Sequence, residues 1–318
     1  MTKTGSTSSV EELLAVRAAW LHFISGLTQS EVADHLQVSR AKAHRLIAAA
    51  MKAGYVRVSV EGEVANCIRH EEQLRERHQL TYCDVVPDLA ETGMPLKALG
   101  YGGARFLQRQ FGNKSASMIG IGHGRSLMAA VDELPLVDTG DTQFMSLLGG
   151  LTRRFTANPH DVIHRLAEQT GAEAYVLPVP FLANSVEDKA VLLAQNGVAE
   201  VFELMSTMDV ALVGIGSVDR EVQLVRSRML KDEELQGVRD AGASGELLGH
   251  FFDDQGKPVE SPFTERIIAP SLQSLQQHNI VALAGGPEKV EAIRAVLNSG
   301  VLSGLITDEQ TAAELIKS

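Results

Sequence analysis

The chain lacks the features that mark disulfide-stabilised, secreted or membrane-spanning proteins. Only Cys67 and Cys83 occur among its 318 residues, and neither belongs to a CxxC motif. This cysteine usage predicts free thiols in a reducing compartment and no metal site. No run of about eighteen apolar residues is present, and the polar residues 1–9 lack the apolar core of a signal peptide. We therefore expect a cytoplasmic protein with no membrane partner and a disordered tail over residues 1–9.

Two nucleotide-binding patterns are also missing. The stretch "GIGHGR" over 120–125 has Arg125 where a GxGxxG motif has its third glycine, and the pattern GxxxxGK[ST] does not occur. Neither a dinucleotide nor a P-loop nucleotide is expected, and no cofactor is predicted.

The net charge of −11 is unevenly distributed. Residues 1–60 contain seven basic and four acidic side chains, so the rest of the chain carries all of the negative excess. The local field near a contact matters more for nucleic-acid binding than the total charge. The N-terminal residues are therefore the candidate DNA-binding part of an otherwise acidic protein.

Residues 26–58 have the pattern of a helix-turn-helix followed by a short strand. Thr28 and Glu31 form a capping box that predicts one helix start, and Ser39 predicts a second helix that runs to about Ala53. The turn "QVS" joins the two helices, although Gln37 occupies the position where glycine is commonest. We predict a winged-helix-like domain over 10–61. An upstream helix is expected to supply its core with Leu13, Leu14, Val16, Trp20 and Phe23.

The outer face of the second helix is basic. The residues predicted to contact DNA are Thr28, Gln29, Ser39, Arg40, Lys42, His44 and Arg45. Arginine suits guanine in the major groove, and lysine and serine suit phosphate oxygens. The alternative is a helical hairpin with a solvated basic face, and the combination of caps, turn and basic cluster favours the DNA reader. Because one such module makes few base contacts, a homo-oligomer on a double-stranded operator is expected.

Residues 62–80 predict a charged, helical connector with Ile68, Leu74 and Leu80 on one side. The pattern leaves open whether this segment is a linker or part of an oligomer interface.

From residue 81 to 318, short apolar runs alternate with amphipathic helices. The runs are "YCDVVP", "ASMIGIG", "TQFMSLLGG", "AYVLPVP", "DVALVGIGS", "NIVALAGG" and "LSGLITD". This alternation predicts a doubly wound, mostly parallel α/β sheet covered on both faces. Ligands in such sheets bind beyond the carboxyl ends of the strands.

Four of the predicted strand ends are rich in glycine: 120–124, 149–150, 214–216 and 285–286. Glycines allow backbone N–H groups to approach an anion, and a following helix start adds a favourable dipole. Arg125, Arg153, Arg154 and Lys289 follow these glycines and add positive charge. Plain turns are the alternative for any one pair, but the set of four favours a small anionic ligand.

These motifs together resemble the SorC family of bacterial sugar-responsive transcriptional regulators. The resemblance covers residues 10–318 and is carried by "GLTQSEVADHLQVSRAKAHRLI", "GIGHGRSL", "LLGGL", "VGIGS", "GELLGHFFDDQG" and "ALAGGPEKVEAI". The arginine pair after the second glycine pair is most similar to the polyol branch, which includes erythritol-catabolism regulators.

The resemblance implies an effector domain similar to sugar-phosphate isomerases, and an oligomer that is commonly a tetramer. The residues expected to bind a sugar or polyol, phosphorylated or not, are Gly120, Gly122, His123, Gly124, Arg125, Ser126, Gly150, Thr152, Arg153, Gly216, Ser217, Asp253 and Lys289. Asp253 would accept hydrogen bonds from hydroxyl groups, and a turn-forming role for it is equally compatible with "DDQG".

Two other classes of function are weighed against the regulator. An isomerase or deaminase would use acid–base groups such as Asp253, Glu246, His123 or His250, but no catalytic constellation stands out by spacing, so no catalytic residue is predicted. A structural oligomer would use the glycines only for packing. The fused DNA reader favours a regulator that senses a ligand without changing it chemically.

Overall fold

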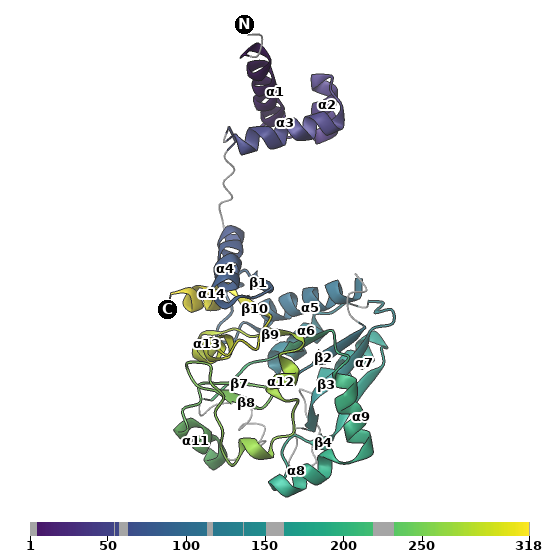
Figure 1. The fold of residues 1–318 in the computed structure, drawn as a ribbon, viewed down its shortest axis with the longest axis vertical. Helices are drawn as coiled ribbons and strands as arrows, with labels where there is room; N and C mark the ends of the chain where they lie inside the picture. Colours follow the sequence, from purple (N-terminus) through teal and green to yellow (C-terminus); the bar gives the residue numbers. More distant parts are fainter. Residues whose placement is uncertain are drawn as a thin grey trace. The chain divides into compact units, whose positions relative to one another are not determined.

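The computed structural model describes residues 5–53, 55–56, 63–112, 117–135, 137–150, 162–218 and 232–317. The chain divides into two compact units, Met1–Glu61 and Gly62–Ser318. Figure 1 shows the helices and strands of both. Each unit is described by itself.

Three helices form the described part of the first unit: α1 (Gly5–Phe23), α2 (Gln29–Leu36) and α3 (Arg40–Lys52). The Glu31 N–H donates to Thr28 Oγ1 at 3.3 Å, and the Thr28 N–H donates to the Glu31 carboxylate at 2.7 Å. The Lys42 N–H donates to Ser39 Oγ at 3.3 Å. Both predicted helix starts are confirmed. The predicted strand over 55–60 falls largely outside the described residues.

The turn between α2 and α3 forms despite its lack of glycine. Gln37 adopts the left-handed conformation, with φ 52° and ψ 45°. Its N–H bonds to carbonyl groups at the end of α2, which closes that helix. Glutamine therefore adopts the left-handed conformation that glycine usually adopts at a helix end. Its Cβ makes this conformation cost free energy.

The predicted core of α1 is wrong in most of its members. Leu13, Val16, Trp20 and Phe23 are all exposed, and only Leu14 packs against the core of the unit. The part of the core that α1 supplies consists mainly of small residues. These are Ala15, Ala18 and Ala19, and Leu21 joins them. The physical reason is close packing of α1 on α3, which small side chains permit and large ones would prevent.

Helix α1 begins at Gly5, within the segment 1–9 that the sequence predicts to be a disordered tail. Extending a helix costs far less than starting one, so polar residues can continue a helix that packing stabilises further along the chain.

The second unit contains a seven-stranded parallel sheet, and every apolar run noted in the sequence supplies one strand. The strands are β1 (Tyr82–Val86), β2 (Met118–Ile121), β3 (Gln143–Gly150), β4 (Ala174–Pro180), β5 (Val210–Val213), β9 (Asn279–Leu283) and β10 (Gly304–Asp308). Their order is β1-β10-β9-β5-β2-β3-β4, and all neighbouring pairs are parallel. The predicted α/β architecture is confirmed.

Both faces of this sheet are covered. On one face α5 (Leu96–Gly112), α6 (Arg125–Asp132) and α7 (Val162–Thr170) bury Ile119, Leu212 and Ile306. On the other, α4 (Glu63–His78), α9 (Asn196–Met205), α13 (Val290–Asn298) and α14 (Glu309–Ile316) cover alternate strand residues such as Ala211 and Leu305. The remaining helical segments are α8 (Val186–Leu193), α11 (Asp232–Asp240), α12 (Leu272–Leu275), η1 (Thr264–Arg266) and η2 (Pro287–Lys289).

The strand order reverses direction between β2 and β5. The chain leaves β2 toward β3 and β4, whereas it leaves β5 toward β9 and β10 on the other side. The connections after β2 and β5 therefore separate above neighbouring strand ends, where open α/β sheets commonly bind ligands. The glycines at 122–124 and 214 follow these two strands.

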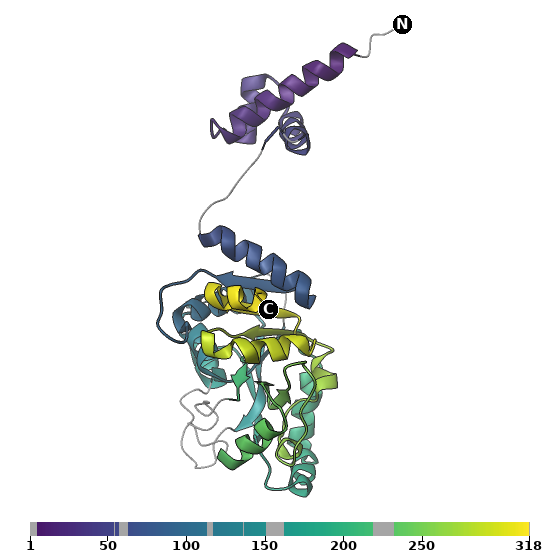
Figure 2. The ribbon, with the colours of Figure 1, turned by 90° about the vertical axis from the view of Figure 1, so that its left-hand side faces the viewer.

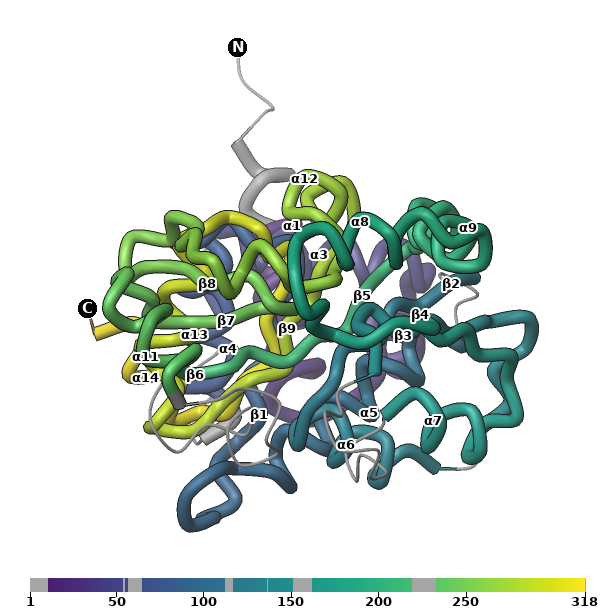
Figure 3. The backbone as a smooth tube through the Cα atoms, turned by 90° about the horizontal axis from the view of Figure 1, so that it is seen from below, coloured from purple at the N-terminus to yellow at the C-terminus, as the bar shows by residue number. Residues whose placement is uncertain are grey.

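The second unit also contains a small antiparallel sheet that the sequence pattern does not predict. It consists of β6 (Gly216–Ser217), β7 (Gly245–Leu247) and β8 (His250–Phe252). Gly245 packs directly on α13, where its missing Cβ would lie 2.5 Å from the Ala292 carbonyl oxygen. Figure 3 shows β7 running beside α13. These strands are too short to give an alternating pattern that a sequence reading can recognise.

The connector predicted over 62–80 is α4, and it belongs to the second unit. It packs on β1 and α14, as Figure 2 also shows. Leu74 and Leu80 are buried as expected, together with Cys67, whereas Ile68 is exposed. The Arg77 guanidinium donates to the carbonyl oxygens of Leu315 and Ile316, both at 3.2 Å, and so caps the C-terminal end of α14.

Candidate effector site and DNA-binding face

Six of the seven predicted DNA-contacting residues are exposed on the first unit. Arg40, Lys42, His44 and Arg45 are exposed on α3, while Ala43, Leu46 and Ile47 of the same helix are buried. Ser39 and Thr28 are exposed and cap their helices, and Gln29 is half-buried. The exposed basic residues of α3 are therefore different from the residues that pack this helix into the core of the unit.

The first glycine of "GIGHG" has a packing role. Gly120 lies within β2, where a Cβ would come within 2.1 Å of Met208 Sδ. It is buried in the sheet and does not line the strand end.

The glycines beyond β2 and β5 bring two loops together. The Gly122 N–H donates to the Leu212 carbonyl oxygen at 2.9 Å. A Cβ on Gly214 would lie 3.2 Å from the His123 carbonyl oxygen. Gly124 precedes α6 with φ 133°, and no side chain caps that helix start. These loops therefore meet at the topological switch, beside an uncapped helix N-terminus.

Lys289 connects the fourth glycine loop to the third. Its Nζ donates to the Ile215 carbonyl oxygen at 2.6 Å, between Gly214 and Gly216. Burial, and then the positive charge of Arg125, lowers the pKa of Lys289 to about 8 from its usual 10.5, against an opposing contribution from the Glu246 carboxylate. The positive charge of Arg125, 164 positions away in the sequence, therefore acts on Lys289 in the folded chain.

Glu246 is the main residue of this region that the effector prediction omits. It lies on β7 and is 9% exposed, and its Oε1 accepts a hydrogen bond from the Gly249 N–H at 2.6 Å. Burial raises its pKa, while the Gly249 N–H and Lys289 act in the opposite direction. A Cβ on Gly216 would lie 2.3 Å from Glu246 Oε2, so the glycine allows the carboxylate to approach. The sequence signal is an acidic residue inside the apolar run "GELLGHFF".

Other predicted effector residues are placed differently. The ring of His123 lies near β3, with Nε2 3.1 Å from Ser146 Oγ, and Ser126 is buried at the start of α6. Gly150 is the exposed last residue of β3, and Ser217 is half-buried on β6. Thr152 and Arg153 lie outside the described residues, as does Arg154.

Asp253 adopts the turn-forming arrangement that the sequence left open. Its Oδ1 accepts hydrogen bonds from the backbone N–H groups of Gln255 at 3.0 Å and Lys257 at 2.8 Å. A Cβ on Gly256, in the same turn, would lie 2.3 Å from the Asn298 carbonyl carbon. This turn is therefore at the C-terminal end of α13, whereas Lys289 directly precedes its first residue.

The fourth glycine loop is also bonded to α14. The Gly286 N–H donates to Thr311 Oγ1 at 2.7 Å and to Asp308 Oδ2 at 3.2 Å. Thr311 Oγ1 in turn donates to Asp308 Oδ2 at 2.6 Å, and Asp308 caps α14. Both side chains are buried, so the fourth glycine loop and the N-terminus of α14 share one buried hydrogen-bond network.

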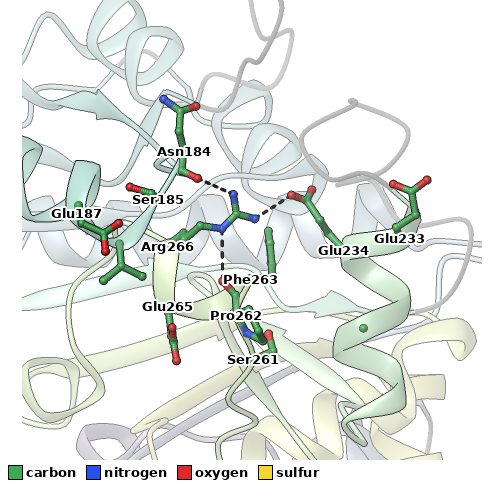
Figure 4. Close-up of a pocket in the computed structure, with 12 residues that line it drawn as sticks. Asn184, Ser185, Glu187, Glu233, Glu234, Ser261, Pro262, Phe263, Glu265 and Arg266 are labelled. Carbon is green, nitrogen blue, oxygen red and sulfur yellow. Dashed lines mark hydrogen bonds and ion pairs between the residues drawn. The ribbon is translucent and has the colours of Figure 1, made fainter.

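A separate cavity of about 620 Å³ lies between α8, α11 and η1 (Figure 4). Arg266 crosses it, and its guanidinium donates to Glu234 Oε1 at 3.0 Å and to the Asn184 carbonyl oxygen at 3.2 Å. Four glutamates line the cavity: Glu187, Glu233, Glu234 and Glu265. Of the predicted effector residues that the structure describes, none lines this cavity, and its excess of negative charge disfavours a phosphate.

Two kinds of feature are missing from the part of the chain that the structure describes. There, no group of three or more His, Cys, Asp or Glu side chains is arranged to hold a metal ion. Within the same residues, none of the helices combines the length and the apolar character needed to cross a bilayer.

Comparisons with known proteins identify the family. Residues 62–317 match the family model described as "Putative sugar-binding domain". The erythritol catabolism regulatory protein EryD of Brucella abortus (strain 2308) is 52% identical over 309 residues, which is 97% of this chain and 98% of that protein. The transcriptional regulator LsrR of Escherichia coli (strain K12) is 31% identical over 313 residues, covering 97% and 96% of the two chains.

Solved structures share the fold. The full-length sorbitol operon regulator SorC from Klebsiella pneumoniae matches with a TM-score of 0.73 at 23% identity, over 96% of this chain and 99% of that one. A DeoR family transcriptional regulator from Listeria monocytogenes matches with a TM-score of 0.72 at 24% identity, over 78% of this chain and 99% of that one.

EryD is named as a regulatory protein and LsrR as a transcriptional regulator, so neither relative supports the enzyme alternative. The resemblance drawn from the sequence motifs is confirmed. The chain belongs to the SorC family of transcriptional regulators, and its sugar-binding domain spans residues 62–317.

Proposed function

We propose that this regulator controls a carbohydrate or polyol catabolic operon in the cytoplasm, and that a phosphorylated sugar or polyol sets its affinity for a DNA operator. The observation that carries the proposal is the position of Lys289, whose Nζ bonds to the Ile215 carbonyl oxygen among the glycine loops at the topological switch, with Arg125 adding a second positive charge. Two cations held near one another repel, and a bound phosphate would relieve that repulsion. A phosphate group is therefore the proposed ligand of these two cations.

The phosphate is proposed to bind Arg125, Lys289 and the backbone N–H groups that follow Gly122 and Gly124. Glu246 is proposed to accept hydrogen bonds from hydroxyl groups of the same ligand, because its buried carboxylate lies near Lys289. Carboxylates offer several acceptor sites, which suits a polyol. Thr152 and Arg153, which follow β3 in the sequence, are retained as proposed contacts. Asp253 and Gly120 are not retained, because their own turn and strand account for them.

DNA is proposed to contact the basic face of α3 through Arg40, Lys42, His44 and Arg45. A homo-oligomer, most simply a tetramer, would present these helices in pairs to a two-fold symmetric operator. The effector would act by favouring one arrangement of the subunits, and thermodynamic linkage then requires DNA to change effector affinity by the same factor.

Contacts within the second unit support a route from the effector to the DNA-binding part. Gly286 bonds to Asp308 and Thr311, α14 packs on α4, and Arg77 of α4 caps the far end of α14. Residues 57–62 then connect α4 to the first unit in the sequence. Movement of the loop around Gly286 on phosphate binding would therefore act, through α14, on α4, which follows the DNA-binding part in the sequence.

The proposal is tested by fluorescence anisotropy on the promoter of a neighbouring operon, with erythritol, its phosphate and other sugar phosphates as probes. Erythritol heads the set because a relative at 52% identity is named for its catabolism. A saturating phosphorylated ligand should change operator affinity, and at a hundredfold excess over Kd it should stabilise the protein by about 2.7 kcal/mol. Absence of DNA binding at moderate salt would overturn the regulator, whereas DNA binding without any ligand response would overturn the effector assignment alone.

The route through α14 is tested with Thr311→Val, which removes the hydroxyl that joins Gly286 to Asp308 but keeps the shape of the side chain. The effector should still bind, with a smaller effect on operator affinity than in the native protein. Ser303→Ala is a matched control, because it removes a hydroxyl bonded to the Ile280 carbonyl oxygen away from this route. Equal responses of Thr311→Val and the native chain would contradict the route.

A further inference from the structure

One side of α1 carries large apolar side chains outside the core of the first unit. Leu13, Val16, Trp20 and Phe23 follow one another at intervals of three, four and three residues. Leu13 is 70% exposed and Trp20 is 56% exposed, and the adjacent Ile24 is 71% exposed. These five residues are called the α1 stripe. A contiguous apolar patch on so small a unit marks a contact surface.

We infer that the α1 stripe is the contact surface for α1 of a second copy of this chain, with the two helices parallel. Alternating intervals of three and four residues are the spacing with which two helices pair as a coiled coil. In that register Leu13 and Trp20 occupy one core position of the repeat, and Val16 and Phe23 occupy the other. The opposite side of α1 is already used, because Ala15 and Ala18 pack against the rest of the unit.

Charged residues beside the stripe select the parallel orientation. Glu12 and Arg17 are both exposed on α1. In a parallel pair they occupy facing edge positions, which sets Glu12 against Arg17 of the partner subunit. An antiparallel pair centred on the stripe would instead place Arg17 near Arg17 of the partner subunit. The Tyr55 hydroxyl donates to Glu12 Oε1 and restrains that carboxylate at the edge of the helix.

The pairing gives the first unit its own two-fold axis. Each α3 is attached to an α1 through packed alanines, so two paired α1 helices present two basic α3 faces related by symmetry. A two-fold symmetric operator requires this arrangement. The purpose of the contact rests on the proposed DNA-binding function, but the contact itself can be tested without DNA.

Cysteine cross-linking of the full-length protein tests the contact. Cys67 and Cys83 are buried, so the native chain serves as the background control. With Val16→Cys, parallel pairing brings two thiols together across the axis, and mild oxidation should produce a disulfide-linked dimer. Glu11→Cys is the matched control, since it is exposed on the same helix and does not belong to the α1 stripe. The Val16→Cys dimer should form about tenfold faster, because disulfides need close Cβ atoms. Equal rates would overturn the inference.

Trp20 supplies a second measurement, because it is the only tryptophan in the chain. Acrylamide should quench it poorly in the native protein and readily in Leu13→Asp, with both proteins folded by circular dichroism. A Trp20 as accessible as free tryptophan in the native protein would overturn the inference. A shielded Trp20 without a Val16→Cys dimer would also overturn it, because the chain's own second unit would then cover the stripe.

Charge reversal tests the orientation. Arg17→Glu should slow Val16→Cys cross-linking, and the pair Glu12→Arg with Arg17→Glu should restore it. Slowing without restoration would contradict the parallel register.

Discussion

The two candidate binding regions are built in opposite ways. The basic face of α3 comes from Arg40, Lys42, His44 and Arg45 of one helix together with its N-cap Ser39, so their spacing follows from local helical geometry. The proposed effector site gathers residues from 122 to 289, and it exists only because β2, β5 and β9 are close in the sheet. The first could be located from local patterns. The second required knowledge of which strand ends adjoin.

This difference predicts that the two regions can be disabled separately. A change on α3 removes an exposed side chain without disturbing a core. A change in the glycine loops alters contacts between several chain segments. Substitutions with matched readouts can therefore show whether each region has a single role.

The largest effect is expected from Lys289→Met. Loss of a charge-assisted hydrogen bond should weaken binding of a phosphorylated ligand by about 2 kcal/mol, or roughly thirtyfold. Isothermal titration calorimetry with a phosphorylated polyol and its neutral parent measures this, and the neutral parent should lose much less. Equal losses for both ligands would contradict the phosphate role. Operator affinity without ligand should stay within twofold of the native value.

Arg45→Ala should weaken operator binding by about 1.4 kcal/mol, or tenfold, because it removes one base or phosphate contact per recognition helix. Anisotropy at fixed salt measures this, and the thermal shift produced by the effector should be unchanged. Lys52→Ala, at the last turn of α3, is the control with little expected effect on DNA binding. If Arg45→Ala abolished both responses, the two regions would not be separable.

The pH dependence sharpens the role of Lys289. Its pKa is lowered to about 8 from 10.5, so the folded protein without ligand loses this proton at a lower pH than the unfolded chain. Between about pH 8 and pH 10.5, Lys289 is more protonated in the unfolded chain than in the folded protein. Its contribution to the free energy of unfolding therefore rises with pH in this range.

Phosphate binding has the opposite trend, because it needs the charged amine. Affinity should fall severalfold between pH 7 and pH 9, with proton uptake on binding at the higher pH. Lys289→Arg, which remains charged, should remove this dependence. A native affinity that is unchanged across the range would show that the Lys289 ammonium is not a phosphate ligand.

The smallest effect is expected in the turn between α2 and α3. Gln37→Gly should stabilise the first unit by about 1 kcal/mol, because glycine adopts the left-handed conformation without a Cβ penalty. Chemical denaturation monitored at Trp20 measures this. Asp34→Gly, at an exposed position within α2, should destabilise the same unit and is the control for a general effect of glycine. A Gln37→Gly variant less stable than the native chain would contradict the strain assigned to the turn.

Several features could be read from the sequence because they depend on neighbours along the chain. The Thr28–Glu31 capping box, the Ser39 cap and the seven parallel strands all follow from local residue types and periodicity. The same reasoning failed for α1. Large apolar residues at helical spacing predict a buried face, but the choice of face depends on what packs there, and α3 packs on alanines.

What the sequence determined by itself is the class of each unit and the chemistry available to it. Glycines at strand ends, arginines after them and a basic helix are local facts. What only the tertiary structure decided is which of these residues meet. Lys289 bonds to the backbone between Gly214 and Gly216 and is influenced by the charge of Arg125. Glu246 is paired with Gly216 in a short antiparallel sheet, and Asp253 is held in a turn at the other end of α13. The physical reason is that a parallel sheet joins strands distant in sequence, and its order is set by packing of the whole core.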